Sequence, residues 1–89
     1  MVAKVTPQSA EILGLQALGW LVAEPERLDR LLLLSGMEPA GLQAAAGDPH
    51  LLGAVLEFLL ADEGLLLAFC EDNGARPAAI HLARHVLEG

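Results

Sequence analysis

The densest run of large apolar residues lies in the middle of the chain, over residues 48–70. Asp48 and Pro49 predict a helix start there, because a carboxylate accepts from the first-turn amides and proline has no amide to leave unpaired. On a helix of about 3.6 residues per turn, apolar side chains cover nearly the whole circumference of this segment. The narrow remaining strip holds His50, Gly53 and Glu57. A helix with so little polar surface is expected to be surrounded by other helices, so we place it at the centre of the fold.

A second cap signal, Asp62, lies inside the same run. We expect the chain to bend near Ala61 and Asp62, because an apolar stripe with its own carboxylates opposite begins there. The stripe consists of Leu65, Leu66, Phe69 and Cys70, and the carboxylates are Glu63, Glu71 and Asp72. Neither glycine nor proline stands at the bend, so one continuous helix over residues 49–72 is the alternative.

Prolines mark the other helix starts. Each of them precedes a segment with helical spacing of apolar residues, in the pairs Thr6-Pro7, Glu24-Pro25, Glu38-Pro39, Asp48-Pro49 and Arg76-Pro77. Gly36, Gly47 and Gly74 are placed to end helices. No stretch alternates apolar and polar residues, so we predict an all-α fold, a compact bundle of five to six short helices with no β-sheet. We expect a single helical domain over residues 6–89, behind a flexible leader of residues 1–5.

The helix faces predict which side chains form the core. In the first helix the expected core face holds Ala10, Leu13, Ala17, Leu18 and Leu21, with Trp20 and Val22 at its margins. Gly14 and Gly19 cost about 1 kcal/mol each relative to alanine in a helix, and we expect them to let another helix approach closely. In the last helix the expected core face holds Ala79, Ile80, Leu82, Ala83, Val86 and Leu87.

The second helix carries more leucine than its core stripe needs. The stripe consists of Leu28, Leu31 and Leu32, and Leu33 and Leu34 fall outside it. These two leucines are either covered by a neighbouring helix or form a contact surface for another chain.

Charge narrows the class of partner. Five Lys and Arg residues stand against twelve Asp and Glu residues, which gives a net charge of −7, whereas nucleic-acid binding needs a basic patch. The same sign disfavours anionic membrane surfaces, and charged residues interrupt every apolar run before about 18 residues. We therefore expect neither nucleic acid nor a membrane as a partner. The first residues lack a signal-peptide core and one cysteine cannot make an internal disulfide, so we expect a cytoplasmic protein.

Candidate chemistry is sparse. His81 and His85 are four residues apart, a spacing at which two imidazoles can share a metal, but they lie on the polar helix face beside Arg84, where exposed histidines are ordinary. Cys70 projects from an apolar stripe, as an inert core thiol does. We find no nucleotide, nucleophile or metal motif, and we expect no enzyme, no metal and no cofactor. The rival hypotheses are a helix-turn-helix DNA-binding protein, which the charge opposes, and a small metal-dependent enzyme using His81 and His85.

The remaining hypothesis is a module that binds another protein or itself, as a monomer or a weak homodimer. Leucines outside the core stripes and an acidic helix end beside Asn73 and Gly74 are the features that favour it. The candidate surface consists of Trp20, Leu33, Leu34, Leu67, Glu71 and Asp72.

Three segments resemble a known family. They are PERLDRLLLLSGMEP, AAAGDPHLLGAVLEFLLADEGLLLAF and NGARP, within a similarity that extends from about Ala10 to Ala83. The chain resembles small alphaproteobacterial proteins catalogued only as a domain of unknown function. The resemblance implies an alphaproteobacterial origin and a helical fold, is compatible with a bacterial signalling context, and brings no activity, cofactor or catalytic residue.

Overall fold

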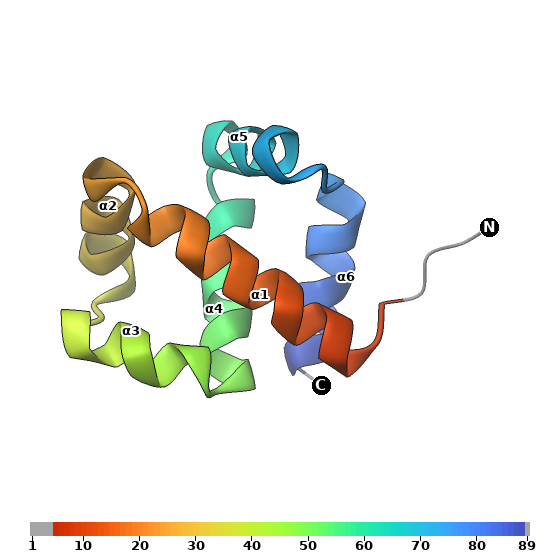
Figure 1. Cartoon of the computed structure of the whole chain (residues 1–89), viewed down its shortest axis with the longest axis horizontal. Helices are drawn as coiled ribbons and strands as arrows, with labels where there is room; N and C mark the ends of the chain where they lie inside the picture. Colours follow the sequence, from red (N-terminus) through yellow and green to blue (C-terminus); the bar gives the residue numbers. More distant parts are fainter. Residues whose placement is uncertain (1–4, 89) are drawn as a thin grey trace.

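Six α-helices follow one another along residues 5–88, the part of the chain that the computed structural model describes, and no strand occurs among these residues (Figure 1). They are α1 (Pro7–Val22), α2 (Pro25–Ser35), α3 (Pro39–Ala46), α4 (Pro49–Leu60), α5 (Glu63–Asn73) and α6 (Pro77–Glu88). The prediction of an all-α fold is confirmed. The break between α4 and α5 is also confirmed, so the alternative of one continuous helix is wrong. Of the predicted leader, residues 1–4 lie outside the described residues, and Val5 is half-buried against the core.

Local chemistry explains where the helices begin. The Thr6 hydroxyl accepts from the Ser9 amide at 3.1 Å and the Ser9 hydroxyl accepts from the Thr6 amide at 2.8 Å, a capping box at the start of α1. The Asp48 carboxylate accepts from the His50 amide at 2.9 Å. At the start of α5, the Asp62 carboxylate accepts from the Leu65 amide at 3.1 Å. The two aspartates therefore act as the predicted caps.

Two helices end at glycines with a left-handed backbone. Gly36 has φ 72° after α2 and Gly74 has φ 66° after α5. A side chain at either position would strain the backbone, which is why glycine stands there. The amide of Asn73 ends α5 as well, since its Nδ2 donates to the Phe69 carbonyl at 3.0 Å.

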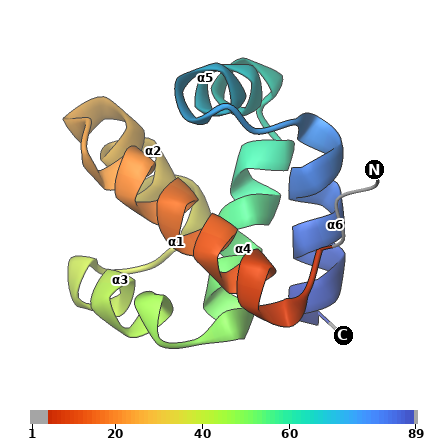
Figure 2. The same cartoon turned by 45° about the vertical axis from the view of Figure 1, so that its right-hand side comes forward.

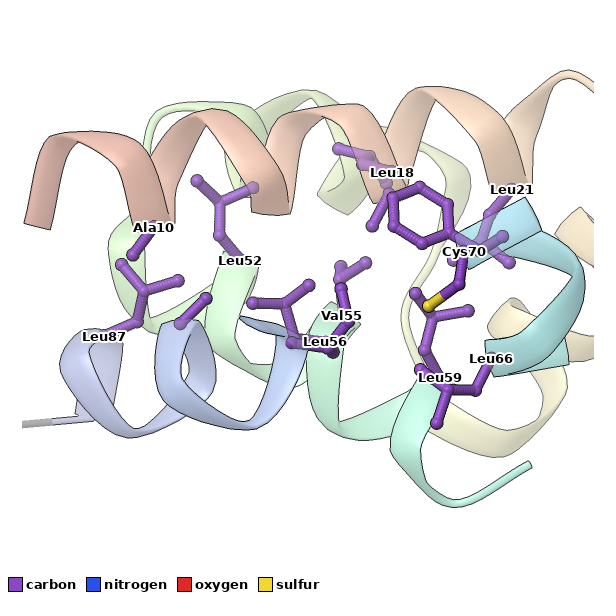
Figure 3. Packing of buried hydrophobic residues seen from close by; sticks show 14 of the residues in the cluster. Ala10, Leu18, Leu21, Leu52, Val55, Leu56, Leu59, Leu66, Cys70 and Leu87 are labelled. Carbon is purple, nitrogen blue, oxygen red and sulfur yellow. The ribbon is translucent and has the colours of Figure 1, made fainter. Parts of the chain in front are cut away.

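The central helix is α4, as its composition predicted. It packs against α1 and α6, which also pack against each other, while α3 and α5 lie at its opposite ends (Figures 1 and 2). Figure 3 shows Leu52, Val55 and Leu56 of α4 in the space between α1 and α6. The largest fully buried side chains are Phe69, Leu21, Leu31, Leu52, Leu56, Leu59, Ile80 and Val55.

Gly14 sets the distance between α1 and α4, whereas Gly19 and Gly53 do not require a close approach. A Cβ added to Gly14 would lie 2.9 Å from the Leu52 Cβ, so the close approach predicted there is confirmed. Gly19 has no atom within 4 Å of such a Cβ, so the same prediction is wrong at Gly19. Gly53 was placed on the polar strip of α4, but it is buried, and its added Cβ would lie 3.5 Å from the Leu87 Cβ of α6.

Candidate interaction surface

The Trp20 side chain of α1 joins three helices. Its Nε1 donates to the Asp72 carboxylate of α5 at 2.8 Å, and its ring meets Phe69 edge to face, with centroids 5.6 Å apart. The Arg27 guanidinium of α2 lies over the same ring, 3.7 Å from its centroid. An edge-to-face pair contributes about 0.5–1.5 kcal/mol and an exposed cation–π contact about 0.5–1 kcal/mol. Trp20 and Asp72, both predicted surface residues, therefore bind each other and hold α1, α2 and α5 together.

The outer side of α2 carries the most exposed leucines. Leu33 is 81% exposed and Leu34 is 67% exposed, so the alternative in which a neighbouring helix covers them is wrong. Arg30 lies on the helix surface between them, since it is three residues before one and four before the other. Its guanidinium pairs with the Asp62 carboxylate at the start of α5. This end of α2 is therefore an apolar surface beside an ion pair that ties it to α5.

A third exposed leucine lies on α5. Leu67 is 51% exposed, and Glu63 and Glu71 stand four residues before and after it on the same side of the helix. Asp72 is five residues from Leu67 and therefore points to a different side, toward Trp20. The six predicted surface residues thus divide into three groups, at the end of α2, around Leu67, and at the contact between Trp20 and Asp72.

Sequence reasoning missed the outer face of α1. Ile12 is 57% exposed there, and Leu15 and Val22 are exposed as well. A shallow hollow on this face is lined, among the described residues, by Gln8, Glu11, Ile12 and Leu15. The spacing of the apolar residues could have indicated this face, because they occupy two opposite sides of α1. The prediction considered only the side that faces the core. For Leu82 of α6 the prediction was wrong in the other direction: the core was expected to contain it, and it is exposed.

The residues with possible metal or nucleophile chemistry lie apart. His81 and His85 are both exposed on α6, and between them Arg84 donates from Nη1 to Glu88 Oε1 at 2.9 Å. No group of three or more His, Cys, Asp and Glu side chains within residues 5–88 is arranged to hold a metal ion. Cys70 is buried on α5, and burial raises the pKa of its thiol. A thiol that keeps its proton is a poor nucleophile.

No helix within residues 5–88 is both long enough and apolar enough to cross a bilayer.

Comparison with known proteins gives one match. A family model described as "Protein of unknown function (DUF3572)" matches residues 7–89 of the chain. No curated protein matches the chain, and no solved structure matches it.

Proposed function

The chain belongs to the DUF3572 family, whose function is unknown, and we propose that it is a small module that binds another protein or a second copy of itself. The observation that supports the proposal is the exposure of two consecutive leucines, Leu33 and Leu34, at the end of α2. Fully burying a leucine side chain contributes about 1.5–3 kcal/mol, so a partner covering both gains a substantial driving force. Neither side chain contributes to the core, because Leu31 is the residue that α2 buries there.

Charge sets the chemistry of the partner. The chain carries a net charge of −7, and Glu63 and Glu71 flank Leu67. A partner that covers Leu67 with an apolar side chain and places Lys or Arg beside the two carboxylates would match this part of the surface. The net charge argues against the helix-turn-helix alternative. The alternative of a metal-dependent enzyme rests on His81 and His85 alone.

A cytoplasmic location is part of the same proposal. An acidic chain with a single buried cysteine suits the cytoplasm, where thiols remain reduced. The family resemblance is the support for an alphaproteobacterial origin and for a signalling context.

The proposal is tested by photo-crosslinking in cells that produce the protein. Benzoylphenylalanine replaces Leu33 in one variant, and in the control it replaces Gln43, which is exposed on α3. We expect a discrete crosslinked species from position 33 that is absent from position 43. The Leu34→Asp variant should keep its helicity by circular dichroism and should remove the species. Equal labelling from both positions, or none from position 33, would contradict the proposal, and an unfolded Leu34→Asp chain would show that Leu34 belongs to the core.

A further inference from the structure

The outer face of α1 has the spacing of a coiled-coil seam. Gln8, Ile12, Leu15, Gly19 and Val22 follow one another at steps of four, three, four and three residues. This alternation keeps all five positions on one side of a helix and is the pattern that packs against a second helix. The buried residues of α1 lie on the opposite side, where they contact α4 and α6. In Figure 1, α1 crosses in front of α4, and no other helix covers the side that faces the viewer.

The five positions form a self-complementary set. Gly19 has no atom within 4 Å of an added Cβ, so it leaves a gap in the seam, and Leu15 is the projection four residues away. When two such helices run antiparallel about a two-fold axis near residue 17, Leu15 of each copy meets Gly19 of the other. The same axis brings Ile12 against Val22. A two-fold interface requires this reciprocity, in which each copy supplies both the projection and the gap.

Charge on α1 fits the same arrangement. Two copies with a net charge of −7 each repel one another, and a contact surface with few charged residues adds little local repulsion to this; Glu11 is the sole charged residue between Pro7 and Val22. The two-fold axis places Glu11 at the level of Ala23 of the second copy, away from the equivalent glutamate but next to the level of Glu24, a like-charge approach that further weakens the pair. The hollow beside Ile12, which Gln8 and Glu11 also line, lies where Val22 of the second copy would enter.

We propose that the outer face of α1 binds a second copy of this chain as an antiparallel helix pair, with Leu15 packed into the gap at Gly19. The proposal goes beyond the proposed function, because it places self-association on α1 and not on the α2 surface of Leu33 and Leu34. The seam is about 20 Å long, and one helix from each copy buries less than the roughly 800 Å² per partner of a standard interface. The dimer is therefore weak and concentration-dependent.

The test measures the dimer dissociation constant by light scattering over a concentration series. Gly19→Glu fills the gap and adds a carboxylate, while the free monomer has open space at this position and gains helix propensity. Gln43→Glu adds the same charge on α3 and is the control. We expect Gly19→Glu to raise the dissociation constant at least about tenfold and Gln43→Glu to leave it within about twofold, with equal helicity in both.

Cysteine pairing tests the antiparallel direction. A mixture of the Ile12→Cys and Val22→Cys variants should form a disulfide-linked pair under mild oxidation, and neither variant alone should do so. A parallel seam would link each variant to itself, and that result would overturn the arrangement.

The other outcomes separate this proposal from the proposed function. A wild-type chain that stays monomeric at every concentration overturns the α1 dimer, while crosslinking from position 33 would still support a different partner. A dimer that is insensitive to Gly19→Glu but lost in a Leu33→Asp/Leu34→Asp variant also overturns the α1 proposal and supports the α2 surface. Loss of position-33 crosslinking together with a dimer sensitive to Gly19→Glu would support the α1 proposal and contradict a role for α2.

Discussion

Alanine at Gly14 and alanine at Gly19 are the same chemical change in the same helix, and we expect them to change the stability in different directions. Both replacements remove backbone freedom from the unfolded chain and raise helix propensity, a gain of about 0.8–1 kcal/mol each. The two sites differ in their surroundings. The new Cβ at Gly14 would lie 2.9 Å from the Leu52 Cβ, and the new Cβ at Gly19 would meet nothing within 4 Å.

The contact at Gly14 cannot be relieved by a rotamer change. The Leu52 Cβ is fixed to the α4 backbone, so α1 and α4 must separate by roughly 0.6–1 Å to restore an ordinary carbon–carbon distance of about 3.5–4.0 Å. Overpacking of this kind costs about 1–3 kcal/mol. Subtracting the propensity gain leaves Gly14→Ala between about neutral and 2 kcal/mol less stable. Gly19→Ala keeps its full gain, so the difference between the variants is the strain alone, about 1–3 kcal/mol.

The measurement is urea unfolding followed by circular dichroism, with thermal melts as a second readout. Each 1 kcal/mol corresponds to a shift of about 4–8 °C in Tm for a domain of this size. All samples should be held at low concentration, because Gly19 lies in the proposed dimer seam and self-association would add to the apparent stability. If both alanines stabilise the chain equally, the close approach of α1 and α4 at Gly14 is refuted. If Gly19→Ala destabilises it by 1 kcal/mol or more, the open surface at Gly19 is refuted.

Three further changes test other contacts. Asp62→Ala removes the cap of α5 and the ion pair with Arg30. In urea unfolding it should lower the free energy of unfolding by about 1 kcal/mol for the cap and by under 1 kcal/mol for the exposed pair. Asp62→Asn, which retains a cap, should cost less, and equal losses from the two variants would contradict the capping role. Trp20→Phe removes the hydrogen bond to Asp72 and should cost about 0.5–1.5 kcal/mol; in a double-mutant cycle with Asp72→Ala the two losses should not add, and additivity would show that the bond contributes nothing. Cys70 should react with a thiol reagent much more slowly in the folded chain than in urea. Because the folded state holds the thiol proton at a raised pKa, stability should also fall as the pH rises above the thiol's ordinary pKa of about 8.5, a decline that Cys70→Ala would remove.

The helix boundaries were predictable because they depend on a few neighbouring residues. Proline at the first position, a carboxylate or hydroxyl before it, and glycine at a left-handed position act within one turn, and no distant contact can easily override them. The break at Asp62 is the clearest example, since it divides an apolar run with no glycine or proline at the bend. The Asp62 carboxylate caps α5 and also pairs with Arg30, so one side chain stabilises the corner from two sides.

Which side of each helix is buried was less predictable, because it depends on which other helix packs against it. Gly53 and Leu82 illustrate the limit, since the first lies against Leu87 and the second faces solvent, each contrary to its expected side. Leu33 and Leu34 were left between two alternatives for the same reason. In a chain that is 54% hydrophobic, apolar residues exceed what six short helices can bury, so spacing alone cannot tell core from surface.

The excess apolar surface is concentrated where the bundle has no further helix to cover it. Central α4 packs against every other helix of the described chain, whereas α1 and α2 lie at the periphery and carry apolar residues on their outward sides. A peripheral helix needs one apolar side to hold its place, and Ala10, Ala17 and Leu21 already provide that side of α1. The second apolar side of α1 is only partly buried in the folded monomer, since Ile12, Leu15 and Val22 are exposed, and exposed apolar surface raises the tendency to associate. The uncharged positions of this seam and the reciprocal places of Leu15 and Gly19 within it are the two features on which the proposed pairing with a second copy of α1 rests.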